Sequence, residues 1–173
     1  HRRWTYISHS DGILFGTSTD QRRLLKIRAS KGQTAAAATD QLFAYDTKSG
    51  ERLWTYQGKS VSHVSIAVGD GRIFFVDATM RPDQREAFLR QDKSEFKKLK
   101  GKARERAEQR LKKQDLRLAT ALEIRTGRKA WERAVDVTDC SGVGIGAGSL
   151  TLMHTDGHLV LGGANANGHY WKQ

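Results

Sequence analysis

Apolar residues occur in short runs separated by turn residues over much of the chain, a pattern typical of antiparallel strands. Asp-Gly turns at positions 11–12, 70–71 and 156–157 are each followed by such a run: Ile13–Gly16, Ile73–Val76 and Leu159–Gly162. Each turn therefore predicts a pair of strands. Trp4 is placed in the strand before the first turn, although it could instead close a preceding hairpin.

A longer segment, Leu42–Trp54, occurs again as Ala121–Trp131. Each copy predicts a β-hairpin, with an apolar first strand and an acidic residue that can accept backbone N–H bonds at the turn. A glycine supplies the positive φ of the turn, and a tryptophan anchors the return strand in a core. The equivalent residues of this repeat are Asp46 and Glu123, Gly50 and Gly127, and Trp54 and Trp131.

The pattern changes between the two copies, where Pro82 suits a first helical turn and strong helix formers continue to about Arg117. An apolar stripe follows helical spacing: Phe88, Phe96, Leu99, Ala103, Ala107, Leu111 and Leu118. One helix of roughly 35 residues would separate its ends by about 52 Å, whereas neighbouring strands lie about 5 Å apart. The chain must therefore turn back, and Gly101 predicts two antiparallel helices that meet there.

These elements resemble quinoprotein-type β-propellers, whose blades carry an Ala-Leu-Asp-x-x-Thr-Gly-x-x-x-Trp pattern. Glu123 and Ile124 depart from that pattern in the second copy. The resemblance implies an all-β fold of about two and a half four-stranded antiparallel blades with an inserted α-helical hairpin. Blades would span 1–78 and 119–173, with an extended loop at 18–41 and the basic insertion at 79–118. We expect the chain to be a segment of a larger propeller.

Strand parity places every long connection at one end of these blades and every short turn at the other. The long segments are 18–41, 57–61, 79–118, 132–148 and 163–173, the first of which could hold a short strand at 24–27 or a helical turn. Binding residues tend to lie on loops held by a rigid scaffold. We therefore expect function at the end with the long segments, although such loops can also be tolerated without a function.

The formal net charge is +11, and most of it lies in the insertion. Interspersed acids and the lack of aromatic platforms favour a solvated surface there over a nucleic-acid surface. The basic candidates are Lys97, Lys98, Lys100, Lys102, Arg104, Arg106, Lys112 and Lys113. The single cysteine, Cys140, excludes an internal disulfide framework. No apolar run reaches the roughly 18 residues of a membrane-spanning helix.

Candidate binding residues are short polar or titratable side chains, four of which lie in the long segments, and the asparagines can equally be turn formers. They are Asn165, Asn167, His169, Asp139 and His63. The histidines show no metal-ligand spacing, and glycines at 142–148 are better explained by close backbone packing than by a phosphate cradle. No Ser/His/Asp arrangement is apparent, so we expect neither catalytic residues nor a metal site in this segment.

Enzymes of the resembling family use pyrroloquinoline quinone (PQQ) with calcium and often a vicinal disulfide, and this chain has no adjacent cysteines. Other members are non-catalytic scaffolds, such as outer-membrane assembly lipoproteins. We expect a binding or scaffold module without a cofactor, in a periplasmic or secreted bacterial protein, which contacts other blades and a protein partner. The alternatives are a fragment of a PQQ-dependent oxidoreductase and a polyanion-binding or nucleic-acid-binding module.

Overall fold

The computed structural model describes residues 2–20, 38–62, 65–77, 80–90, 98–138 and 150–163. Within these ranges the chain is mostly β, with three antiparallel sheets and two helices. The first sheet has the order β1 (Arg3–Ser10), β2 (Ile13–Thr19), β3 (Ala38–Asp46) and β4 (Arg52–Ser62). The second has β5 (Ile66–Gly69), β6 (Arg72–Asp77), β7 (Leu116–Glu123) and β8 (Lys129–Asp136). The third consists of β9 (Thr151–Thr155) and β10 (His158–Gly162).

The three Asp-Gly turns each join the first two strands of a sheet. Asp11 and Gly12 both have positive φ, at 51° and 74°, and the other two pairs repeat this conformation. Two successive residues with positive φ characterise the type I′ turn, whose twist matches that of the flanking strands. The predicted strand pairs are confirmed, with Trp4 in β1.

The repeated tryptophan hairpins form β3–β4 and β7–β8, and their turns share the same backbone bonds. Gly50 N–H donates to Asp46 O over 2.9 Å, and Gly127 N–H donates to Glu123 O over 2.9 Å. The two acidic side chains act differently, however. Asp46 Oδ1 accepts the amides of Ser49 and Lys48, which lower the pKa of its carboxyl, whereas Glu123 bonds the side chains of Arg128 and Thr126.

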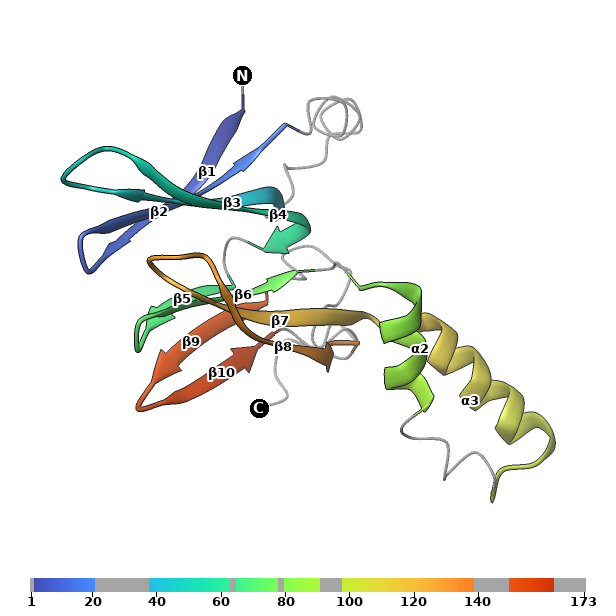
Figure 1. Ribbon diagram of the computed structural model, residues 1–173. Coiled ribbons are helices and arrows are strands. Elements are labelled where there is room, and N and C mark those ends of the chain that lie inside the picture. The colour runs from blue at the N-terminus through green and yellow to red at the C-terminus, as the bar shows by residue number, and fades with distance from the viewer. Residues whose placement is uncertain are drawn as a thin grey trace.

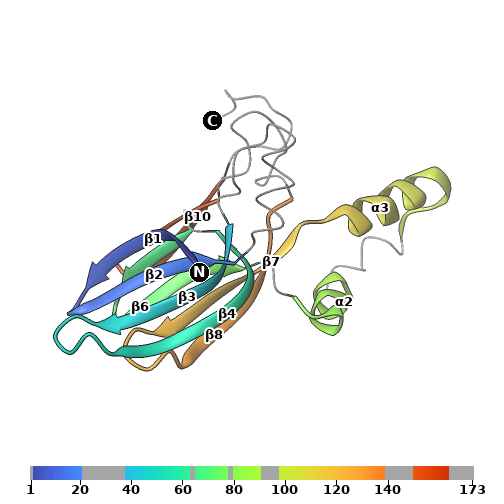
Figure 2. The ribbon, with the colours of Figure 1, turned by 90° about the horizontal axis from the view of Figure 1, so that it is seen from above.

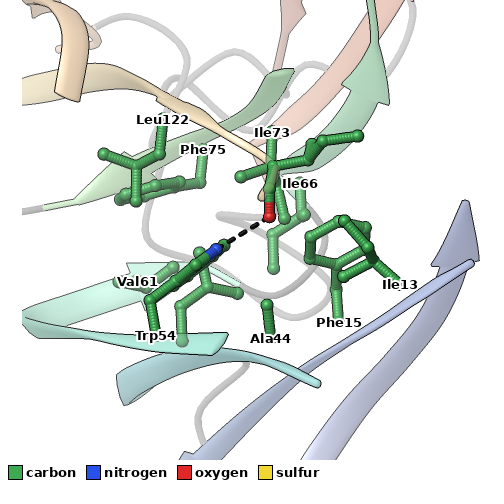
Figure 3. Packing of buried hydrophobic residues seen from close by; sticks show 11 residues of the cluster. Ile13, Phe15, Ala44, Trp54, Val61, Ile66, Ile73, Phe75 and Leu122 are labelled. Carbon is green, nitrogen blue, oxygen red and sulfur yellow. Dashed lines mark hydrogen bonds between the residues drawn. The ribbon is translucent and has the colours of Figure 1, made fainter. Parts of the chain in front are cut away.

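The three sheets are stacked face to face in chain order, as Figures 1 and 2 show. The largest buried cluster lies between the first two sheets (Figure 3) and contains Ile13, Phe15, Leu42, Ala44, Trp54, Val61, Ile66, Ile73, Phe75, Leu122 and Ile124. The second sheet packs its opposite face, through Phe74 and Ala121, against Leu152 of the third. Alternating strand positions therefore give the middle sheet two buried faces.

Helices α2 (Pro82–Arg90) and α3 (Gly101–Lys113) lie between β6 and β7. α2 leads away from the sheets and α3 leads back, at the end opposite the hairpin turns (Figures 1 and 2). One expected bound was wrong: α3 ends at Lys113, whereas we expected helix to about Arg117. α2 is described as far as Arg90, and 91–97 lie outside the described residues. Leu118 belongs to β7, where Leu116 and Leu118 are both buried in the sheet rather than in a helical stripe.

Strands also occupy parts of the segments that we expected to be long connections. β4 includes 57–61, β8 includes 132–136, and β2 and β3 include both ends of 18–41. Pairing with a neighbouring strand explains the difference: Val61 lies opposite Thr39, and Arg133 lies opposite Ala119. The strand or helical turn expected at 24–27 lies outside the described residues.

Candidate functional site

The five binding candidates taken from the sequence, Asn165, Asn167, His169, Asp139 and His63, lie outside the described residues, as do Cys140, 142–148 and Lys97. Their proximity to one another therefore stays a prediction. The described basic candidates lie at the end with the helices: Lys98, Lys100, Lys102, Arg104 and Arg106 are all exposed. Lys112 and Lys113 belong to the last turn of α3. The basic residues thus share one short stretch of chain.

Within the described part of the chain, one of the five exposed cations near the start of α3 forms an ion pair. Arg104 forms an ion pair with Glu108 one turn further on, with Nε and Oε1 3.0 Å apart. Among the described residues, the other four cations make no ion pair. Exposed lysines of this kind present positive charge to solvent and can attract an anionic partner over about a Debye length, about 8 Å at physiological salt.

Polar contacts fix the base of the two helices to the second sheet. Arg85 Nη2 donates to Gln114 O over 3.0 Å, which connects α2 to the residue after α3. Gln84 Nε2 donates to Glu132 Oε1 of β8 over 3.2 Å, and Gln114 Nε2 donates to Asp136 Oδ2 over 2.9 Å. Hydrogen bonds therefore hold the ends of the helices that lie next to the second sheet, and the part of α3 farthest from the sheet is exposed.

A buried carboxylate joins the first two sheets near the same end. Asp77, the last residue of β6, is fully buried and accepts the amide of Ser60 over 2.8 Å. It also accepts the amide of Lys59 and the hydroxyl of Tyr56, the latter over 3.1 Å. Burial and this carboxylate raise the pKa of Tyr56. The sequence reasoning missed this joint, although an acid directly after the apolar run Ile73–Val76 was a signal for it.

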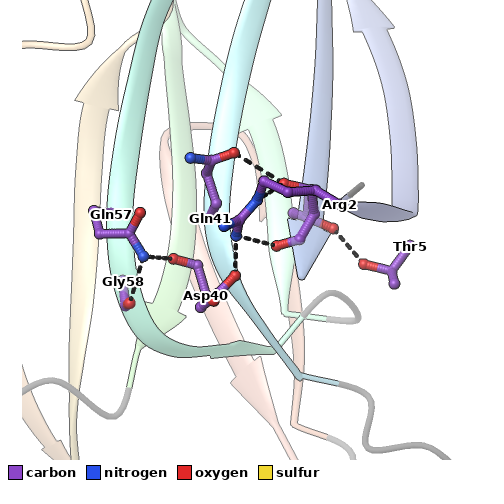
Figure 4. A network of polar contacts seen from close by, with 8 residues as sticks. Arg2, Thr5, Asp40, Gln41, Gln57 and Gly58 are labelled. Atoms are coloured by element: carbon purple, nitrogen blue, oxygen red, sulfur yellow. Dashed lines mark hydrogen bonds and ion pairs between the residues drawn. The ribbon is translucent and has the colours of Figure 1, made fainter. Parts of the chain in front are cut away.

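A second polar cluster lies in the first sheet where β2 ends and β3 begins (Figure 4). Arg2 donates to Ser18 Oγ over 2.9 Å and forms an ion pair with Asp40. Ser18 Oγ donates to Gln41 Oε1 over 2.9 Å, and Gln57 Nε2 donates to Asp40 O over 2.7 Å. These contacts connect Arg2 to the end of β2 and to the start of β3.

The two repeat tryptophans have similar surroundings within their own sheets. Trp54 lies opposite Ala44, and Trp131 lies opposite Ala121. Each ring also lies about 6 Å from a phenylalanine of the second strand, at 6.2 Å for Phe15 and 5.9 Å for Phe74. They differ across the sheets: Trp54 donates its indole N–H to Ile124 O of the second sheet over 2.8 Å, whereas Trp131 has no described acceptor and is only half buried.

No group of three or more metal-binding side chains occurs within the described ranges. In the same ranges, no helix has the length and apolar character needed to span a membrane. No protein-family model matches the chain, and no curated protein matches its sequence.

Proposed function

We propose that the chain is part of a non-catalytic β-propeller that serves as a binding or scaffold module in a larger extracytoplasmic protein. Three antiparallel sheets stacked in chain order support this architecture, since propeller blades are four-stranded sheets arranged around an axis. The extracytoplasmic location rests on the resemblance of the repeat to quinoprotein-type blades.

The observation that carries the binding role is the position of α2 and α3. They project from the end of the stack opposite all described hairpin turns. Hydrogen bonds near the sheets hold α2 to β8 and to Gln114, the residue that follows α3. A rigid stack that presents an exposed element at one end is suited to contact a partner there. The partner would be a protein, bound by the exposed side chains of the helices and the neighbouring connections.

Site-specific photocrosslinking in the native cell tests this assignment. A photoreactive side chain replaces Lys102 at the start of α3 in one variant and Lys48 in the β3–β4 turn in the other, both exposed positions. We expect a discrete protein adduct from position 102 and none from position 48. Adducts from position 48 alone, or from neither position, would contradict the proposed binding surface.

Polyanion binding is a second candidate, because Lys98, Lys100 and Lys102 are exposed and lie within five residues of each other. Replacing these three lysines by glutamine should weaken heparin binding and reduce its salt dependence, since each lost contact removes released counterions. The matched control neutralises Lys48, Arg52 and Arg72 at the opposite end and should leave binding unchanged. Binding that is insensitive to salt would rule this candidate out.

A further inference from the structure

The described part of the chain contains three copies of the dipeptide Asp-Gly in the same backbone conformation. Asp11, Asp70 and Asp156 have φ of 51°, 48° and 45°, and each is followed by a glycine of positive φ. All three aspartates are exposed. The copies therefore share their local chemistry and differ mainly in what surrounds each turn, so they can be compared with one another within one protein.

An Asp-Gly peptide can rearrange without an enzyme. The glycine nitrogen attacks Cγ of the protonated aspartate, the amide hydrogen and the carboxyl hydroxyl leave together as water, and a five-membered succinimide ring forms. Water then opens the ring. Cleavage of the bond between the nitrogen and Cγ restores aspartate, whereas cleavage of the original peptide bond gives isoaspartate, in which the backbone continues through Cγ. Glycine favours the reaction because it has no Cβ to obstruct its nitrogen.

The closed turn opposes formation of this ring. In a type I′ turn, ψ of the first central residue is about +30°, and the glycine nitrogen then points away from the aspartate Cβ. Ring closure therefore requires rotation about the Cα–C bond of the aspartate, which opens the turn. Contacts that hold a turn closed should slow the reaction, as they slow the exchange of its amide hydrogens.

The hairpin of the first sheet holds the first Asp-Gly turn closed. Gly12 O accepts the backbone N–H of Thr47 over 3.0 Å and the hydroxyl of the same residue over 2.8 Å. Arg125 of the second sheet's hairpin turn also donates from Nη2 to Asp11 O over 3.3 Å. Three hydrogen bonds from outside the turn therefore restrain its two carbonyl groups.

The second turn is restrained at its backbone and at its reactive side chain. Gly71 O accepts the N–H of Ile124 over 3.1 Å, which is the equivalent contact of the second hairpin. The Asp70 carboxylate pairs with His154, with Oδ2 and Nε2 3.2 Å apart. The imidazole is itself stacked on Phe74, with ring centroids 5.1 Å apart. It therefore holds the carboxyl group in one position.

The third turn has less support within the described part of the chain. Its sheet consists there of β9 and β10 alone, so the turn lacks the neighbouring hairpin that the other two have. The described contacts of Asp156 are local: its carboxylate accepts the hydroxyl of Thr155 over 3.4 Å, and its carbonyl lies 2.8 Å from Nδ1 of His158. No described backbone N–H outside the strands donates to Gly157 O. Because an isolated pair of strands is only marginally stable, this turn should open most readily.

We propose that Asp156 is a site of spontaneous isoaspartate formation and the fastest of the three Asp-Gly sites. Water is the only other reactant, and no cofactor takes part. Isoaspartate lengthens the backbone between β9 and β10 by one carbon, so the type I′ turn and the register next to it are lost. The modification therefore loosens the packing of Leu152 on Phe74 and Ala121 of the second sheet. This inference does not depend on the proposed binding function.

Incubation of the folded protein in water enriched in heavy oxygen measures each site separately. Every passage through the ring introduces one heavy oxygen atom, and fragment-ion mass spectrometry assigns it to a residue and distinguishes isoaspartate from aspartate. We expect label to accumulate at Asp156 about threefold to tenfold faster than at Asp11 or Asp70, the factor that one or two hydrogen bonds contribute to an opening equilibrium. Asn167, which precedes a glycine, is counted separately because its deamidation exchanges nitrogen for oxygen.

Two controls separate the effect of the fold from that of the flanking sequence. In guanidinium chloride the turns are unfolded, so the three rates should converge. Thr47→Val removes the hydroxyl bonded to Gly12 O with little change in side-chain size. This variant should accelerate labelling at Asp11 and leave the rate at Asp156 unchanged.

Equal labelling of the three aspartates in the folded protein would overturn the proposal. The same lead of Asp156 in guanidinium chloride would overturn it too, because the flanking residues rather than the turn contacts would then be the cause. An unchanged rate at Asp11 in Thr47→Val would contradict the role assigned to those contacts. Label at Asp156 without isoaspartate would show that the ring always reopens to aspartate, which would exclude the modification.

Discussion

Two side chains connect the first and second sheets at opposite ends of their shared core. Trp54 bonds the Ile124 carbonyl beside the hairpin turns, and Asp77 bonds two amides of β4 near the helices. Each connection satisfies a buried polar group that would otherwise be costly to bury. The relative position of the sheets is thus fixed by directional bonds as well as by apolar packing.

The Tyr56 hydroxyl bonded to Asp77 predicts a loss of stability at alkaline pH. Because the folded state raises the pKa of Tyr56, the unfolded chain releases this proton first, above its ordinary pKa of about 10. The stabilisation is complete below that pH and is lost as the pH rises further. Urea unfolding of the protein and of Tyr56→Phe at about pH 9 and 11 should show a smaller pH-dependent loss in the variant.

Tyr45→Phe serves as the control, since it removes a phenol hydroxyl that takes no part in the contact between Tyr56 and Asp77. It should retain the alkaline loss of the unmodified protein. An equal loss in Tyr56→Phe and in the unmodified protein would contradict the prediction.

At the scale of elements, the two turn classes and the insertion have separate physical causes. Asp-Gly turns depend on positive φ at both residues, whereas the tryptophan hairpins depend on bonds to an acidic residue and a single glycine. The helical insertion does not interrupt the sheet, because the strands on either side of it, β6 and β7, pair from Arg72↔Glu123 to Asp77↔Leu118.

Replacing residues 80–113 by a short glycine–serine turn should therefore leave the sheets folded. A shorter connection reduces the entropic cost of bringing β6 and β7 together, by about 0.6 kcal/mol for each halving of its length. This gain offsets the loss of the hydrogen bond between Gln84 and Glu132. Circular dichroism should lose its helical component while the midpoint of thermal unfolding changes little. A flexible replacement of equal length is the control for loop length, and a large fall in the midpoint in both variants would show that the helices stabilise the sheets.

The whole molecule is a stack in which the position of a sheet decides how its repeat residues are used. The first hairpin packs its tryptophan on the second sheet. The equivalent tryptophan of the second hairpin faces the two-stranded third sheet, which has no such hairpin in the described part of the chain. The equivalent tryptophans of the two hairpins, Trp54 and Trp131, therefore differ in burial.

This asymmetry predicts unequal effects of the two matched substitutions. Trp54→Ala should lower the free energy of unfolding by about 3 to 5 kcal/mol, as expected for a buried aromatic side chain. Trp131→Ala should cost clearly less, because its ring is half exposed and its N–H has no described acceptor. Urea unfolding measures both changes, and equal losses would contradict the stacking of Trp54 between sheets.

Local patterns were sufficient to predict much of the fold. Asp-Gly and Gly50 or Gly127 specify turns through backbone conformation, and alternating apolar residues specify strands, so the sheet order followed from the repeat. The helix bounds could not be predicted in the same way, since Leu118 fits both a helical and a strand spacing. Pairing with Asp77 and Ala134 decides in favour of the strand.

The candidate site was less accessible to sequence reasoning. The basic residues were recognised from their density. Their exposure, and the finding that four of them make no ion pair with another described residue, depend on where α3 and the residues just before it lie. The joint at Asp77 was not recognised, because its partners Tyr56, Lys59 and Ser60 lie on another sheet and bond it mainly through backbone amides that carry no residue-specific signal.

By itself, the sequence determined the strands, the turns and the existence of a repeat, since these depend on backbone preferences and on side-chain alternation between near neighbours. Only the tertiary structure decided which faces are covered: Ile7 and Ile66 occupy equivalent positions, yet one is exposed and the other buried. The reason is that burial is a property of the neighbouring sheet, which a residue's own sequence context does not encode.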